Sequence, residues 1–279
     1  MEDGRWHLQH GPIDLVIGFD GDPAACSDAL AQAWDRFGDV LAELVPVLAQ
    51  LRNPVLAEAT WLPPVETMPI AARMVAACVP FAVRHRLFVT PMAAVAGAVA
   101  DDIVTSFARP GIRRAFVNNG GDIALHLAPG ERYELGIVTR LDTPAIDARF
   151  AVDAAASVRG IATSGWRGRS FSLGIADAVT VLAADAAAAD AAATMIANRV
   201  DIDSDSPAVV RRPAVELKDD TDLGSRLVTV AVGELSREEV ERALDAGAAF
   251  AEELCREGVI AAAALALRGR SRVVRANPD

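Results

Sequence analysis

Apolar and polar residues follow both strand-like and helix-like periods along this chain. Trp6–Asp20 is predicted to form two strands around Gly11-Pro12, and the second strand, IDLVIGF, is largely apolar. The turn residues Gly21-Asp22-Pro23 then introduce a long amphipathic pattern, because proline is tolerated in the first turn of a helix. Helical patterns are predicted at Ala24–Leu51, Glu66–Val79, Pro91–Phe107, Asp185–Ala197 and Ser236–Glu257.

The strand-like segments interrupt this order in pairs that resemble hairpins. The remaining strand predictions are Arg86–Thr90, Arg113–Asn118, Asp122–Leu127, Tyr133–Thr139, Phe150–Ala154, Val179–Ala183, Leu227–Val232 and Val259–Leu267. Paired strands favour an α+β fold with mixed sheets and packed helices over a doubly wound parallel fold. We expect a single domain over residues 1–279, made of two interlocked subdomains, in which only the polar stretch Asp201–Ser225 resembles a linker.

Two patterns of small or apolar residues concern close packing and association. Ala93, Gly97 and Ala100 share one face of the helix predicted at Pro91–Phe107, which indicates a close contact. The strand Val259–Leu267 is apolar throughout, so both of its faces must be covered, either centrally in a sheet or by a second subunit. A homodimer is therefore expected.

Charge and composition exclude several classes of function. The formal net charge is −11, and such an acidic chain is a poor partner for nucleic acid. The apolar runs are shorter than the roughly 20 residues of a membrane span, and the N-terminal MEDGRWHLQHG lacks a signal peptide's apolar core, so we expect a cytoplasmic protein without a membrane partner. Lys218 is the single lysine and lies in an acidic run, which argues against lysine-based phosphate or Schiff-base chemistry. Cys26, Cys78 and Cys255 are far apart and predict buried reduced thiols.

A glycine-rich turn, Asn118-Asn119-Gly120-Gly121-Asp122, separates two predicted strands. One interpretation is a tight turn that uses asparagine and glycine for positive φ angles. The other is a backbone cradle, in which the asparagine amides and Asp122 reach the hydroxyl groups of a ligand. The motif alone leaves both interpretations open.

A second loop combines hydroxyl groups, glycine and arginine. Thr163-Ser164-Gly165 is followed by Arg167 and Arg169, a combination that favours an anion but also fits a polar loop. Asp177, just before a predicted strand, is either a turn residue or a ligand. Histidine does not suggest a metal site, because His7 and His10 point to opposite faces of a strand.

Asp190 is the sharpest single candidate, because it is acidic in an alanine-rich helix. If the Asp190 side chain is exposed, it needs no special explanation. If it is closely packed, as alanine on both sides suggests, its carboxylate must be paired or bind a cation. Thr194 lies on the same helix face one turn later. The two oxygen ligands would suit Mg²⁺, with Asp177 as a further candidate ligand.

Four segments, taken in order, resemble the ApbE-like superfamily, whose characterised members are flavin transferases. They are Ala96–Asp101, Val117–Ile123, Ala162–Gly165 and Ala189–Thr194. The stretches TSGWRGRSFSLGIADAVTVLA and ADAAATMIAN resemble a small uncharacterised prokaryotic branch of that superfamily more closely still.

The resemblance implies an ApbE-like fold and a site for FAD and Mg²⁺, from which FMN is transferred to a Thr or Ser of an acceptor protein. It implies that Asp190 and Thr194 hold the metal and that Gly120-Gly121-Asp122 form the flavin-nucleotide loop. Two positions depart from the family pattern. Ala96 replaces a lysine, and Phe171–Asp177 replaces a segment that contains a histidine. Two functions stay open: an enzyme that transfers FMN or cleaves the FAD pyrophosphate, and a binding protein that kept the fold but lost flavin transfer.

Overall fold

The computed structural model describes residues 4–56, 60–137, 148–202 and 206–276, and these form two compact units. Unit 1 comprises Met1–Leu135, Phe150–Ala162 and Ala183–Ala191, and unit 2 comprises Gly136–Arg149, Thr163–Leu182 and Ala192–Asp279. The boundary passes through the elements β5 (Arg132–Ile137), β6 (Ala148–Asp153), β7 (Gly160–Ser164), β8 (Ala178–Ala183) and α5 (Ala186–Arg199).

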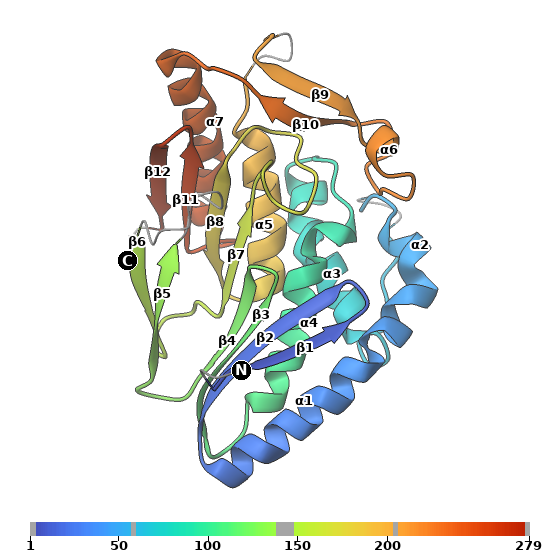
Figure 1. The fold of residues 1–279 in the computed structure, drawn as a ribbon, viewed down its shortest axis with the longest axis vertical. Helices are drawn as coiled ribbons and strands as arrows, with labels where there is room; N and C mark the ends of the chain where they lie inside the picture. The colour runs from blue at the N-terminus through green and yellow to red at the C-terminus, as the bar shows by residue number, and fades with distance from the viewer. Residues whose placement is uncertain (1–3, 57–59, 138–147, 203–205, 277–279) are drawn as a thin grey trace. The chain divides into compact units, whose positions relative to one another are not determined.

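Antiparallel strands form the framework of unit 1 (Figure 1). Their spatial order is β1 (Trp6–His10), β2 (Ile13–Gly21), β3 (Ile112–Asn119), β4 (Asp122–Leu127) and then β7. The register places Asn119 opposite Asp122 at the β3–β4 turn, and Ile123 of β4 opposite Ile161 of β7. Because side chains alternate along a strand, Asn119 and Asp122 lie on the same sheet face as Val117 and Ala124, which are fully buried.

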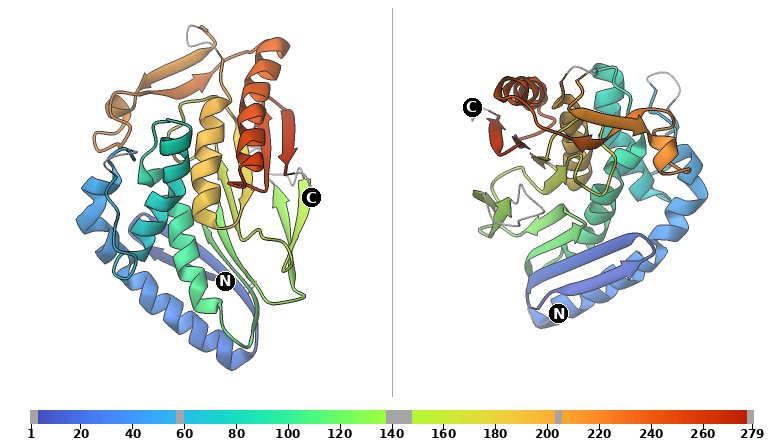
Figure 2. Two further views of the ribbon diagram at one scale, coloured as in Figure 1. Left: turned by 180° about the vertical axis from the view of Figure 1, so that it is seen from behind. Right: turned by 45° about the horizontal axis from the view of Figure 1, so that its top comes forward.

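Helices cover that face of the strands (Figures 1 and 2). Helix α1 (Pro23–Leu44) packs against β1, β2 and α4 (Val95–Val104), and α4 in turn packs against β3 and β4. Asp22 caps α1 by accepting from the backbone N–H groups of Ala24 and Ala25. The other helices of this unit are η1 (Val45–Val47), α2 (Leu48–Leu51), α3 (Pro69–Val79), the π-helix η2 (Pro80–Arg84), η3 (Pro91–Ala94) and η4 (Thr105–Phe107).

Unit 2 contains two antiparallel groups of strands. In one, β11 (Ala262–Leu267) lies between β8 and β12 (Arg270–Arg275), and α7 (Arg237–Arg256) packs against β11 and β12. In the other, β9 (Val209–Pro213) pairs with β10 (Leu227–Val232), and α6 (Ala214–Leu217) follows β9. Helix α7 begins with a capping box formed by Ser236 and Glu239.

The α+β prediction is confirmed, and most predicted elements are present. The apolar strand of the C-terminal part is central between two neighbours, as expected, although it begins at Ala262. One prediction is wrong: Arg86–Thr90 has no regular secondary structure, and Arg86 adopts a positive φ of 53°. Among the described residues, no helix has both the length and the apolar character needed to cross a membrane.

Three strands were missed or misread, and each has a local reason. Strand β7 ends in Thr163 and Ser164, whose hydroxyl groups favour a loop, and β9 lies in the stretch that resembles a linker. Strand β12, RSRVVR, carries a charged residue at every second or third position, which hides its pattern.

Candidate functional site

The β3–β4 turn of unit 1 is built as its sequence predicts. Gly120 and Gly121 have φ angles of 67° and 118°, which glycine adopts without strain. The Asn118 side-chain oxygen accepts from the Gly121 backbone N–H at 2.8 Å. Asn119 is buried, and its amide donates to the Ala96 carbonyl at 3.1 Å. The tight turn is confirmed, whereas ligand binding by this loop stays a prediction.

Helix α5 places Asp190 beside the beginning of α4. The carboxylate accepts a hydrogen bond from the Gly97 backbone N–H at 3.0 Å, and the Ala96 amide also contributes. Neighbouring Ala189, Ala191, Ala192 and Ala193 are fully buried, whereas the Asp190 residue keeps some surface exposed although its carboxylate is desolvated. The close packing that alanine predicted is therefore present, and the carboxylate satisfies two of the free amides of a helix start.

A second carboxylate, that of Asp122, lies near Asp190 on the helix side of β4. Burial raises the pKa of Asp190 well above its ordinary value, and the negative charge of Asp122 raises it further. Like charges in a partly desolvated place repel, so a cation at this point would relieve the repulsion. Unit 1 thus brings together three of the predicted site residues, Asn119, Asp122 and Asp190.

The hydroxyl groups of the second predicted loop belong to unit 2. Thr163 and Thr180 are hydrogen-bonded at 2.9 Å, and the Thr194 hydroxyl reaches the Ser164 hydroxyl at 3.4 Å. Gly165 is buried, and a Cβ atom there would lie 2.6 Å from the Asp177 carbonyl oxygen. Thr194 follows Asp190 by one turn of α5, as predicted, and its hydroxyl is half-buried.

Asp177 of unit 2 is surrounded by hydrogen-bond donors. Its carboxylate accepts from the Trp166 indole N–H at 3.2 Å, from Arg167 Nε at 3.0 Å and from the Arg268 backbone N–H at 2.6 Å. Arg167 also lies over the Trp166 ring, 5.0 Å from its centroid. Arg169 is exposed. These contacts tie Asp177 and Arg167 to each other, and a role for either in ligand binding stays a prediction.

Asp101 lies in the segment Ala96–Asp101 but is not among the predicted site residues. Asp101 lies on α4 and is 6% exposed, and both of its carboxylate oxygens accept from amides at the beginning of α5. Burial is the largest influence and raises the pKa of Asp101 to about 7. An aspartate pair inside the apolar sequence AGAVADDIV was the available signal, because buried carboxylates require partners.

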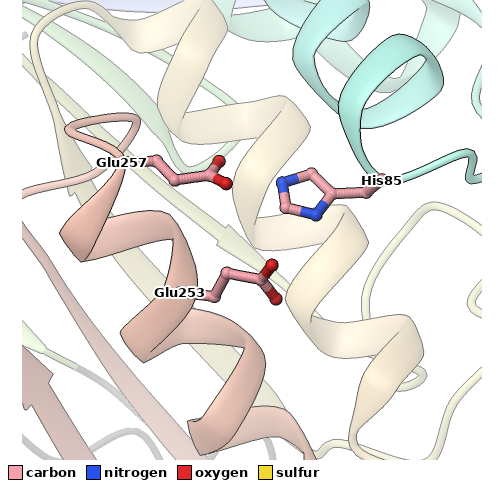
Figure 3. A group of neighbouring side chains, drawn as sticks. All are labelled: His85, Glu253 and Glu257. Atoms are coloured by element: carbon pink, nitrogen blue, oxygen red, sulfur yellow. The ribbon is translucent and has the colours of Figure 1, made fainter.

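The last turn of α7 and the residue after it carry two further carboxylates, Glu253 and Glu257 (Figure 3). Their side chains point from the same side of the helix, as expected at a spacing of four residues. His85, also labelled in Figure 3, follows η2 and belongs to unit 1, whereas both glutamates belong to unit 2. The two glutamates are not among the residues predicted for the site.

The chain matches a protein-family model along almost its whole length. The family is described as AbpE bacteria, and the match covers residues 1–273. The chain belongs to this family. The resemblance to ApbE-like proteins, inferred from four short segments, is thereby confirmed.

Curated relatives of this family member carry the name UPF0280 protein. One from Methanosphaerula palustris is 37% identical over 153 residues, which is 53% of this chain and 59% of the relative. Another, from Methanoculleus marisnigri, is 43% identical over 119 residues, 42% of this chain and 48% of the relative. The chain thus spans about half the length of these relatives.

Solved structures support the fold. The flavinyl transferase ApbE of Pseudomonas stutzeri, in its apo form, superposes with a TM-score of 0.50 at 13% identity, covering 97% of this chain and 93% of that one. The flavin transferase ApbE of Vibrio cholerae gives a TM-score of 0.50 at 13% identity, covering 97% and 96%. At this identity the likeness establishes an ApbE-like fold.

Proposed function

We propose that this protein binds a flavin dinucleotide together with Mg²⁺ and acts on the pyrophosphate of that nucleotide. The observation that carries the proposal is the pair of neighbouring carboxylates, Asp122 and Asp190, at the start of α4. Family membership and the names of the ApbE structures supply the ligand class. The carboxylate of Asp190 and the hydroxyl of Thr194 are the oxygen ligands that Mg²⁺ prefers.

The residues fit a divalent cation by their chemistry. We propose Asp190 and Thr194 as ligands, with Asp177 as the remaining predicted candidate. A bound Mg²⁺ would neutralise negative charge on the phosphoryl oxygens. We propose that the nucleotide is bound by Asn118, Asn119, Gly120, Gly121 and Asp122, and that Thr163, Ser164 and Gly165 supply hydroxyl and backbone groups.

The proposed reaction breaks one P–O bond of the dinucleotide. The oxygen of an acceptor hydroxyl, or of water, bonds to the phosphorus of the FMN half, AMP leaves with the bridging oxygen, and the acceptor's proton is released. With a Ser or Thr of an acceptor protein the product is a flavinylated protein; with water it is FMN. Arg167 or Arg169 would stabilise the phosphoryl oxygens. Partners are thus a nucleotide and an acceptor protein, and the homodimer stays a prediction.

A second function, binding without catalysis, is favoured by two sequence positions. Ala96, beside Asp190, offers only its backbone where the resemblance implies a lysine, and Phe171–Asp177 contains no histidine. A protein of this kind would retain FAD and Mg²⁺ but release no AMP.

One experiment separates the two functions. The protein is incubated with FAD and Mg²⁺, with and without a peptide containing Ser and Thr, and AMP is quantified by chromatography. For the enzyme we expect AMP release that Asp190→Ala lowers at least about a hundredfold, because a lost metal ligand removes several kcal/mol of charge stabilisation. Asp39→Ala, at an exposed position of α1, is the matched control and should leave release unchanged.

The other outcomes are equally clear. Tight FAD binding without AMP, in the presence of the peptide, assigns the binding function. Equal AMP release by Asp190→Ala and the wild type contradicts the proposed metal site. Absence of FAD binding removes both functions in their flavin form.

A further inference from the structure

Helices α4 and α5 cap each other's first turns through two aspartates. Asp101 of α4 accepts from the backbone N–H groups of Ala186 and Ala187, at 2.9 and 2.8 Å. Asp190 of α5 accepts from the Gly97 N–H in the first turn of α4 at 3.0 Å. Each helix therefore supplies the carboxylate that satisfies free amides of the other.

The beginning of α5 has a second, local cap that accounts for its remaining amides. Asp185 accepts from the Ala188 N–H at 2.7 Å through its side chain, and from the Ala189 N–H at 3.1 Å through its backbone carbonyl. The local cap completes the helix start, whereas Asp101 ties that start to α4. The two aspartates thus perform separable tasks at the same helix end.

The two helices approach so closely that neither can slide along the other. A Cβ atom on Gly97 would lie 2.1 Å from the Ala186 carbonyl oxygen, which is far inside van der Waals contact. The Asp101 oxygens reach the amides of Ala186 and Ala187 across this same crossing. A shift of α5 by a fraction of its rise per residue would break both hydrogen bonds or cause a clash.

We propose that Asp101 is a positioning residue for the metal site, resting on the proposed function of Asp190. It fixes the first turn of α5 against α4, and so holds the Asp190 carboxylate, one turn further along the helix, at one place beside Asp122. Asp102, the next residue, has a different task, because it bonds to Arg36 Nε at 2.6 Å. The positioning role therefore belongs to Asp101 and not to the aspartate pair.

The test compares Asp101→Asn with Asp185→Ala, which removes only the local cap. Mg²⁺ affinity is measured by calorimetry and stability by urea unfolding in EDTA. We expect Asp101→Asn to weaken Mg²⁺ binding about tenfold, because asparagine presents an amide group to one backbone N–H and displaces α5. Asp185→Ala should change affinity less than about twofold at a similar loss of stability, since it removes a helix cap but leaves the bonds from Asp101 to α5 in place. Wild-type affinity in Asp101→Asn would overturn the proposal.

A metal-free measurement keeps the proposal separate from the proposed function. We propose a double-mutant cycle from Asp101→Asn, Asp190→Asn and the double variant. The unfolding constants should deviate at least about fivefold from additivity, because both residues stabilise the same contact between α4 and α5. Additive constants overturn the positioning role whether or not Mg²⁺ binds. If the wild type binds no Mg²⁺, the proposed metal function is wrong. The double-variant cycle alone then tests whether Asp101 fixes α5 against α4.

If Asp101→Asn does not fold, the wild-type protein provides the answer by amide hydrogen exchange. The amides of Ala186, Ala187 and Gly97 should be protected to the same degree and exchange together as one opening unit. Fast exchange of Ala186 and Ala187, as at a frayed helix end, would contradict the proposal.

Discussion

Asp190 of unit 1 and Asp177 of unit 2 were both predicted as metal ligands, yet their surroundings are opposite. Asp177 accepts hydrogen bonds from an indole, a guanidinium and a backbone amide, so its negative charge has partners on both oxygens. Among the described residues, Asp190 accepts from the backbone amides of Gly97 and Ala96, and it lies near a second carboxylate, Asp122. Asp177 thus has a donor on each of its oxygens, whereas Asp190 has a second carboxylate nearby that raises its pKa.

The difference explains why two aspartates on similar sequence backgrounds suit different tasks. A carboxylate whose oxygens already accept from fixed donors, one of them a guanidinium, stabilises a fold, because removing the donors would leave a partly buried charge without hydrogen bonds. A carboxylate that raises the pKa of a neighbouring carboxyl group does so because two negative charges would repel, and a bound cation would relieve this repulsion. Two neighbouring carboxylates are thus the stronger indication of a cation site here.

The largest expected effect is a loss of stability when the close contact between α4 and α5, which positions Asp190, is disrupted. Gly97→Ala places a methyl group 2.1 Å from the Ala186 carbonyl and should cost roughly 3 kcal/mol or more in the free energy of unfolding. Gly38→Ala on α1 has no atom within 4 Å of the added Cβ and should stabilise by roughly 0.5–1 kcal/mol. Urea unfolding of both variants checks this pair. A stable Gly97→Ala would mean that α4 and α5 can separate without cost.

The next prediction compares the Mg²⁺ affinities of variants at Asp190 and at Asp177. Asp190→Asn should weaken binding about a hundredfold, because an anionic ligand is lost. Asp177→Asn should weaken it less than about threefold, because its oxygens already serve Trp166, Arg167 and Arg268. Calorimetry on both variants is the measurement. An equal loss in the two would place Asp177 among the metal ligands and abolish the contrast.

The smallest effect concerns pH. Burial, with help from Asp185, raises the pKa of Asp101 to about 7, against the lowering influence of the Ala186 and Ala187 amides and Arg73. The folded state thus holds a proton that the unfolded state releases, and this stabilisation, complete below pH 3.8, disappears as pH rises through about 7.

Between pH 6 and pH 8 the wild type should lose about 1 kcal/mol relative to Asp101→Asn, since one pKa unit is about 1.4 kcal/mol. The variant retains the histidines, so their titration cancels in the difference. Parallel stability curves for the two proteins would show that the Asp101 carboxylate stays ionised throughout this range.

Local sequence determined the elements, whereas the site required distant contacts. The Gly120-Gly121 turn and the alanine-rich helix α5 were predictable, because turn chemistry and helical periodicity act over a few residues. Asp101 and Ala186 are 85 positions apart, and Asp190 and Gly97 are 93 apart. No spacing rule indicates that such residues meet, so the mutual capping could not be inferred.

The same limit applies to Asp177 and to the predicted homodimer. That Asp177 would be surrounded by donors depends on Arg268, 91 positions later. The small residues that suggested association, Gly97 and Ala100, are buried within unit 1. A stripe of small residues does not distinguish an internal helix contact from an interface between subunits, because both need close approach.

The alanine composition of α5 has a consequence for the way this protein can diverge. Its buried positions Ala186, Ala189, Ala191, Ala192 and Ala193 are fully enclosed, so any larger residue adds volume that the packed neighbours must absorb. Glycine would fit, but it weakens the helix. Substitution of these alanines, whether by a larger residue or by glycine, should therefore lower the stability of the protein. The exposed positions of α1 should therefore accumulate substitutions more readily than the buried positions of α5. Helix α5 should serve as a reference point when remote sequences are aligned.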